Sequence, residues 1–206
     1  MKLLVLDADS TLFNEEAIDL LAQATGTKEQ VSKITESAMR GEIDFAASLR
    51  ARVRLLKGLE SSKLQQVGAE LTLTRGAEEL INKARAADFE VAVVSGGFVE
   101  ILKPIMAQLE ISLFRANSLE IVDNQLTGEV SGKIVDAHLK AEILLGFAEM
   151  LGVSSKETIA VGDGANDIEM INAAHIGIAF CAKPALRQVA DYVIDERNLS
   201  LVSKFL

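Results

Sequence analysis

The sequence predicts an α/β fold, in which a doubly wound parallel sheet carries an inserted helical segment and a small β-hairpin. Short continuous apolar runs recur along the chain and alternate with stretches of helical periodicity, which is the pattern of strands joined by crossover helices. A long segment near the start has helical periodicity only. A third stretch, near residue 120, has two short strand-like runs around Asp123 and Asn124.

The apolar runs are expected to be strands buried on both faces of a parallel sheet, and they lie at residues 3–6, 91–94, 159–161, 176–180 and 192–194. Helices are expected between them at residues 77–87, 99–109, 137–151 and 167–174, with a kink at Pro104. The sequence thus divides into an α/β core formed by residues 1–14 and 74–206, a helical cap at 15–73, and a hairpin excursion at 119–130.

Composition limits the class of protein. The chain has 206 residues, of which 49% are hydrophobic and 25% charged, as expected of an ordinary folded protein. Its formal net charge of -9 opposes nonspecific binding to nucleic acid. The first ten residues contain two aspartates and fit neither a secretory signal nor a membrane span. We therefore expect a cytoplasmic protein with no nucleic-acid or membrane partner.

Asp7 and Asp9 follow the first expected strand in the sequence LDADSTL. Open α/β sheets bind ligands outside the carboxyl ends of their strands. Two carboxylates two residues apart in an extended chain can point to the same side, where a hard cation such as Mg²⁺ would offset their repulsion. The alternative is a solvated turn or a helix N-cap, for which Asp is favoured.

A second polar group, Ser95 with Gly96 and Gly97, follows the strand expected at 91–94. Glycines allow close approach of the backbone, and amides at a helix start suit an anion. A tight turn with Ser95 as helix N-cap is the alternative. In the helix expected at 137–151, Lys140 is a candidate cation, with Lys133 and Lys156 as competitors.

A second group of carboxylates lies in GDGAND, residues 162–167, between an expected strand and an expected helix. Asp163 and Asp167 are four residues apart, so both can face one site at a helix start, and Asn166 can bond to its neighbours. A dinucleotide fingerprint is disfavoured, because Asp167 stands where the third glycine would be. A metal or a lysine fits these carboxylates better.

In this order the motifs resemble those of the haloacid dehalogenase-like phosphatases, and the resemblance covers essentially the whole chain. The segments DADSTLFNEE, AMRGEIDFAASLRARV, VSGGF, VGDGAND and IAFCAKP are similar to those of the phosphoserine phosphatases within that group. The resemblance implies a Rossmann-like core with a small inserted cap, a Mg²⁺ cofactor, phosphoserine as the small-molecule substrate and a place in serine biosynthesis. It leaves a homodimer open.

Residue roles follow from the same resemblance. It implies that Asp7 is the nucleophile and Asp9 the general acid and base, and that Asp7, Asp163 and the Asp9 backbone carbonyl hold the metal. It implies that Ser95, Gly96 and Lys140 bind the phosphate and that Asp167 supports the site. It also implies that Glu16 contacts the amino group of the substrate and that Arg52 contacts its carboxylate. Further substrate contacts are implied for Met39, Phe45, Gly97 and Asn166.

Three other functions stay open. A phosphoacceptor signalling domain also combines acidic residues, Mg²⁺, a hydroxyl and a lysine, although the helical insertion argues against it. The chain could also be a phosphatase for another small phosphate ester, or a phosphotransferase that passes the group to an alcohol such as homoserine.

Overall fold

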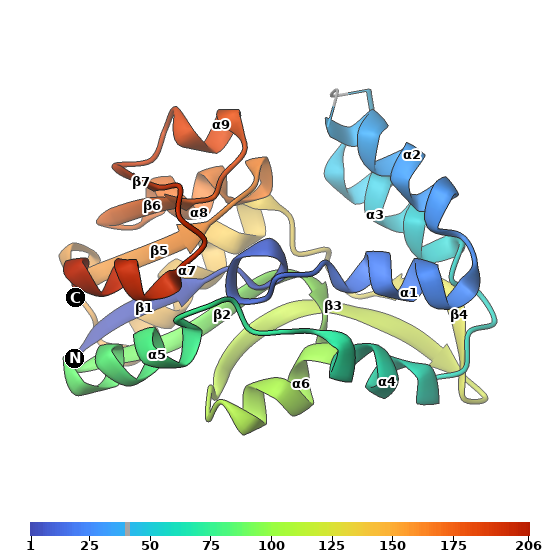
Figure 1. Ribbon diagram of the computed structural model, residues 1–206, viewed down its shortest axis with the longest axis horizontal. Helices are drawn as coiled ribbons and strands as arrows, with labels where there is room; N and C mark the ends of the chain where they lie inside the picture. Colours follow the sequence, from blue (N-terminus) through green and yellow to red (C-terminus); the bar gives the residue numbers. More distant parts are fainter. Residues whose placement is uncertain (40–41) are drawn as a thin grey trace.

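A twisted sheet of seven strands forms the centre of the computed structural model, which describes residues 1–39 and 42–206 (Figure 1). The strand order is β4-β3-β2-β1-β5-β6-β7. Neighbouring strands are parallel except β3 and β4, which are antiparallel. The strands are β1 (Lys2–Leu6), β2 (Phe89–Phe98), β3 (Leu113–Val122), β4 (Gln125–Ser131), β5 (Thr158–Gly162), β6 (Ile176–Phe180) and β7 (Tyr192–Ile194).

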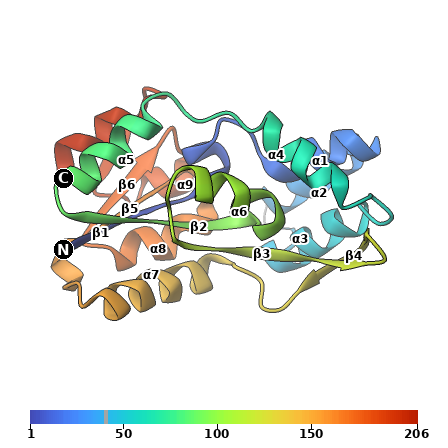
Figure 2. The ribbon, with the colours of Figure 1, turned by 90° about the horizontal axis from the view of Figure 1, so that it is seen from below.

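Helices cover both faces of the sheet, as the doubly wound prediction requires. Side chains alternate along a strand, so Leu4 and Leu6 of β1 belong to one apolar cluster whereas Leu3 and Val5 belong to another. The first cluster lies under α5, α6 and η4, the second under α7 and α8 (Figure 2). These elements are α5 (Ala77–Ala86), α6 (Val99–Gln108), η4 (Leu199–Phe205), α7 (Ala137–Leu151) and α8 (Ile168–Ala173).

The described part of the insertion is helical, as its periodicity predicts. It contains α1 (Ala17–Thr25), α2 (Lys28–Met39), α3 (Phe45–Arg54) and α4 (Ser62–Glu70). A third apolar cluster joins α1, α3 and α4 to the hairpin β3–β4, with Leu49 and Val53 from α3 beside Leu126 and Val130 from β4. In Figure 1 the cap helices lie around the far end of this hairpin. No helix in the described ranges combines the length and apolarity that a membrane crossing needs.

The hairpin differs from its prediction in extent. Its turn at Asp123 and Asn124 is as expected, and both residues have the positive φ, 50° and 61°, that a tight hairpin turn requires. However, β3 begins at Leu113, and its first half pairs with β2 in the central sheet. The sequence shows no apolar run there because this part of β3 is only partly buried. The excursion is therefore an extension of the main sheet.

Candidate active site

The carboxyl end of β1 is the switch point of the sheet. From β1 the chain order continues to β2 on one side and to β5 on the other, and ligand sites in open α/β sheets lie at such points. Asp7 directly follows β1, Ser95 lies near the end of β2, and Asp163 follows β5. Parallel pairing to both neighbours thus brings three sequence motifs to one edge.

Lys140 holds two of the aspartates together beneath this edge. Its Nζ donates to Asp7 Oδ1 at 2.5 Å and to Asp167 Oδ1 at 2.6 Å, and all three side chains are buried. Asp136 caps α7 by accepting from the Leu139 amide at 2.9 Å, which fixes the helical turn that carries Lys140. Burial alone would lower the pKa of Lys140, but Asp167 and Asp7 raise it above its ordinary value. Lys140 is therefore charged.

Asp167 orients the acidic loop. Its Oδ2 accepts from the backbone amides of Asp163 and Gly164, each at 3.0 Å, while its Oδ1 is taken by Lys140. A Cβ atom on Gly162 would lie 2.5 Å from Asp167 Cγ, so this close approach requires glycine. With both oxygens engaged, Asp167 leaves Asp7 and Asp163 as the carboxylates free to face a ligand.

The carboxylate charge exceeds what one lysine balances. Oxygens of Asp7, Asp163 and Asp167 lie within 4.8 Å of one another. Burial, together with the charges of Asp167 and Asp163, raises the pKa of Asp7 well above its usual range despite Lys140, and burial with Asp167 raises the pKa of Asp163 to about 6. A divalent cation that prefers oxygen ligands would supply the missing positive charge. These donors fit Mg²⁺.

Asp9 lies where the core meets the cap. Its Oδ1 accepts from the Ala17 amide, in the first turn of α1, at 3.0 Å. Burial and the nearby charge of Glu16 raise the pKa of Asp9 to about 7, so its carboxyl group can give or take a proton near neutral pH. We expected the chain to stay extended from Asp7 to Asp9. Instead it turns through η1 (Ala8–Leu12), where Ser10 has a φ of 59°.

Ser95, Gly96 and Gly97 belong to the end of β2 and do not form a helix cap. The N-cap of α6 is Phe98, and the buried Ser95 Oγ accepts from the Gly97 amide at 2.8 Å, so the N-cap alternative is wrong. Buried Asn117 supports this turn, because its Nδ2 donates to the Gly96 carbonyl at 2.8 Å.

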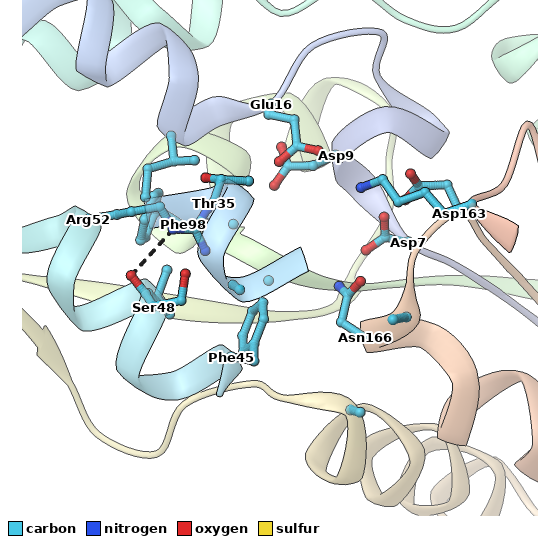
Figure 3. A pocket seen from close by; sticks show the side chains of 18 residues that line it. Asp7, Asp9, Glu16, Thr35, Phe45, Ser48, Arg52, Phe98, Asp163 and Asn166 are labelled. Atoms are coloured by element: carbon cyan, nitrogen blue, oxygen red, sulfur yellow. Dashed lines mark hydrogen bonds between the residues drawn. The ribbon is translucent and has the colours of Figure 1, made fainter. Parts of the chain in front are cut away.

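A pocket of about 360 Å³ opens above these groups, between the core and the cap (Figure 3). Ser95, Lys140 and Asp167 lie buried beneath it. The side chain of Met39 falls outside the described part of the structure. The predicted site residues that line the pocket are Asp7, Asp9, Glu16, Phe45, Arg52, Gly96, Gly97, Asp163 and Asn166.

The cap supplies the wall opposite the aspartates. Arg52 of α3 is only 8% exposed, and burial lowers its pKa, although Glu16, Asp19 and Asp9 oppose this effect. The Phe45 ring reaches across to the core, since a Cβ atom on Gly96 would lie 3.1 Å from Phe45 Cζ. The pocket thus has an acidic floor with one buried lysine, and a cationic wall.

Sequence reasoning missed several residues of this region. Ser48, Thr35 and Lys183 line the pocket, and Asn117 braces the turn at Gly96. Two of them had a signal: Ser48 precedes Arg52 by one helical turn and so shares its face of α3, and Lys183 belongs to the segment IAFCAKP that carries the family resemblance. The others come from segments whose approach to the site is not visible in local sequence.

Comparison with known proteins places the chain in a family. The haloacid dehalogenase-like hydrolase family matches residues 1–175. A phosphoserine phosphatase of Lactococcus lactis is 48% identical over 99% of this chain and 94% of the relative. A phosphoserine phosphatase of Streptomyces coelicolor is 47% identical over 98% of this chain, but the chain spans only 49% of that relative's length.

A solved structure agrees with these relatives. It is described as a phospho-aspartyl intermediate analogue of phosphoserine phosphatase, and it has a TM-score of 0.95 and 44% sequence identity. The similarity covers 100% of this chain and 98% of the other. The α/β architecture predicted from the sequence is therefore confirmed, both by the sheet topology and by this likeness.

Proposed function

This chain belongs to the haloacid dehalogenase-like hydrolases, and from that premise we propose that it is a phosphoserine phosphatase that uses Asp7 as its nucleophile. The observation that carries the proposal is the pocket in which Asp7, held by buried Lys140, faces buried Arg52. This arrangement suits a small substrate with a phosphate at one end and a carboxylate at the other. The hydrolase relatives favour an enzyme over a phosphoacceptor signalling domain.

Two displacements divide the reaction. In the first, an Asp7 carboxylate oxygen attacks phosphorus while the bond from phosphorus to the serine oxygen breaks. Asp9, with its pKa raised to about 7, gives its proton to that oxygen. In the second, Asp9 takes a proton from water as the water oxygen attacks phosphorus and the bond to Asp7 breaks. Serine and inorganic phosphate leave, and both aspartates return to their starting forms.

Charge on the phosphoryl group is met by donors that the fold has already placed. We propose that Lys140, Ser95 and the Gly96 amide stabilise the equatorial oxygens, because fixed donors in a site shielded from water need little rearrangement. Asp7, Asp163 and the backbone carbonyl of Asp9 would hold Mg²⁺. When bound, the ion supplies positive charge that reduces the repulsion between a carboxylate and a phosphate ester.

Substrate recognition would come from the cap. Arg52 can donate to a carboxylate through its planar guanidinium group, and Glu16 can accept from an ammonium group. Phe45 would cover the bound substrate, while Gly97 and Asn166 would contact it near the phosphate. Serine biosynthesis is the pathway that this activity would serve.

The test is phosphate release from a panel of phosphorylated small molecules in the presence of Mg²⁺. We expect steady turnover with the highest kcat/KM for O-phosphoserine, and a loss of at least about 10³-fold in Asp7→Asn. Stable stoichiometric phosphorylation of Asp7 without turnover would contradict the proposal. So would full activity of a folded Asp7→Asn protein, or a preference for esters that have neither an amino nor a carboxylate group.

A further inference from the structure

The hydroxyl of Ser48 is buried without a partner. Ser48 has 0% exposure, and its Oγ forms no hydrogen bond within the described residues. Thr11 and Ser203 also have such a hydroxyl, but of the three only Ser48 lines the pocket. Buried hydroxyl groups are nearly always hydrogen-bonded. An unpaired one in a pocket wall indicates a ligand that supplies the missing partner.

Ser48 and Arg52 form one surface. They lie one turn apart on the same face of α3, and Arg52 Nε donates to the Ser48 carbonyl at 3.4 Å. The two terminal nitrogens of Arg52 have no hydrogen-bond partner elsewhere in residues 1–39 and 42–206. Figure 3 shows both side chains on the wall opposite Asp7 and Asp163. A buried cation and a buried hydroxyl thus face the same space.

We infer that Ser48 is a specificity-determining residue whose O–H donates to the substrate carboxylate that Arg52 binds, an inference that rests on the proposed function. A carboxylate has about four lone-pair sites, more than one guanidinium fills, so it can accept from a neighbouring hydroxyl as well. An ammonium group beside Ser48 would meet the charge of Arg52 instead. The substrate carboxylate is therefore the group that this surface is built to accept.

The test compares two substrates that differ in one group. O-phosphoserine has a carboxylate, whereas O-phosphoethanolamine keeps the phosphate ester and the ammonium group without it. In Ser48→Ala we expect KM for phosphoserine to rise by about 10-fold or more, the factor for losing a hydrogen bond to a charged group, with kcat nearly unchanged. For phosphoethanolamine, both constants should stay within about 2-fold of the wild type.

Ser203→Ala is the matched control, because it removes an equally unpaired buried hydroxyl away from the pocket. It should change neither substrate's constants. Ser48→Ala should unfold at a temperature no lower than the wild type, since it loses an unsatisfied polar atom and gains helix propensity.

Failure of this inference can be distinguished from failure of the proposed function. If the wild type does not hydrolyse phosphoserine, the proposed function is wrong. If the wild type hydrolyses phosphoserine but Ser48→Ala has the wild-type KM for it, only the proposed role of Ser48 is wrong. The same holds if the KM of Ser48→Ala rises equally for phosphoserine and phosphoethanolamine. A Ser48→Ala protein that is less stable than the wild type or does not fold would show a structural partner for the hydroxyl, and would also overturn the inference.

Discussion

Lys140→Met should strongly destabilise the metal-free protein. The substitution keeps an unbranched side chain but removes the ammonium group that lies 2.5 Å from Asp7 Oδ1 and 2.6 Å from Asp167 Oδ1. Removing one partner of a buried ion pair costs about 3–5 kcal/mol, because the other charge stays buried. For a chain of this length, about 1 kcal/mol shifts the melting temperature by about 2–4 °C. We therefore expect the melting temperature of metal-free Lys140→Met to lie about 6–20 °C below that of the wild type.

The size of this loss should depend on pH. Without Lys140, whose charge lowers the pKa of Asp7, that pKa rises further in the folded protein, so the Asp7 carboxyl group binds a proton more tightly there than in the unfolded chain. Such a group stabilises the fold at low pH, and the stabilisation is lost as pH rises through its folded-state pKa. The difference between wild type and variant should thus widen from about pH 5 to about pH 8.

Thermal unfolding followed by circular dichroism in the presence of a chelator measures this effect. Lys156→Met serves as the control, because Lys156 is exposed and its loss should change stability by less than about 0.5 kcal/mol. A deficit for Lys140→Met below about 1 kcal/mol near pH 8, or one that does not change with pH, would refute the interpretation of Lys140 as the buried counter-ion.

Three further results are expected. The pKa values of Asp9 and Asp163, about 7 and about 6, lie above the unfolded value of 3.8, so the stability they contribute is lost as pH rises through these values. The melting temperature of the metal-free protein should therefore fall as pH rises from about 5 to about 8. Saturating Mg²⁺ should raise the melting temperature more at about pH 8 than at about pH 5. An equal rise at both pH values would contradict a Mg²⁺ site at these aspartates. Gly97→Ala places a Cβ atom 2.7 Å from Asp9 Oδ2 and should lower kcat by about 10²-fold, whereas Gly146→Ala, with open space around it, should leave kcat unchanged. Arg52→Ala should lower kcat/KM by about 10²-fold for phosphoserine but by less than about 3-fold for an aryl phosphate, and equal losses would remove Arg52 from recognition.

Much of the fold was predictable because buried parallel strands need continuous apolar runs. The expected strands at 176–180 and 192–194 match β6 and β7, and the helix at 137–151 matches α7. The first half of β3 was missed, since a partly buried strand lacks such a run. The division of the chain into core and cap stays a prediction, because one apolar cluster joins cap helices to the hairpin.

The candidate site was predictable where the chain itself fixes geometry. The sequence predicted that Asp7 and Asp163 each follow a parallel strand, and the structure makes those strands, β1 and β5, neighbours, so the two aspartates meet at one edge of the sheet. The family resemblance predicted that Glu16 and Arg52 contact the substrate, and both residues line the pocket with Asp7. The catalytic and binding roles of these residues stay predictions until variants are measured.

The sequence by itself determined the order of strands and helices, the excess of acidic groups at the strand ends and the family. Tertiary structure alone decided which lysine is buried between two aspartates, which Asp167 oxygen each partner takes, and which serine hydroxyl stays unpaired in a pocket wall. The physical reason is that strand patterns and family motifs depend only on residues that are close together in the sequence. Burial and hydrogen-bond satisfaction depend on segments distant in sequence, such as α7, whose Lys140 donates to Asp7 at the end of β1, and α3, which lies across the pocket from Asp7.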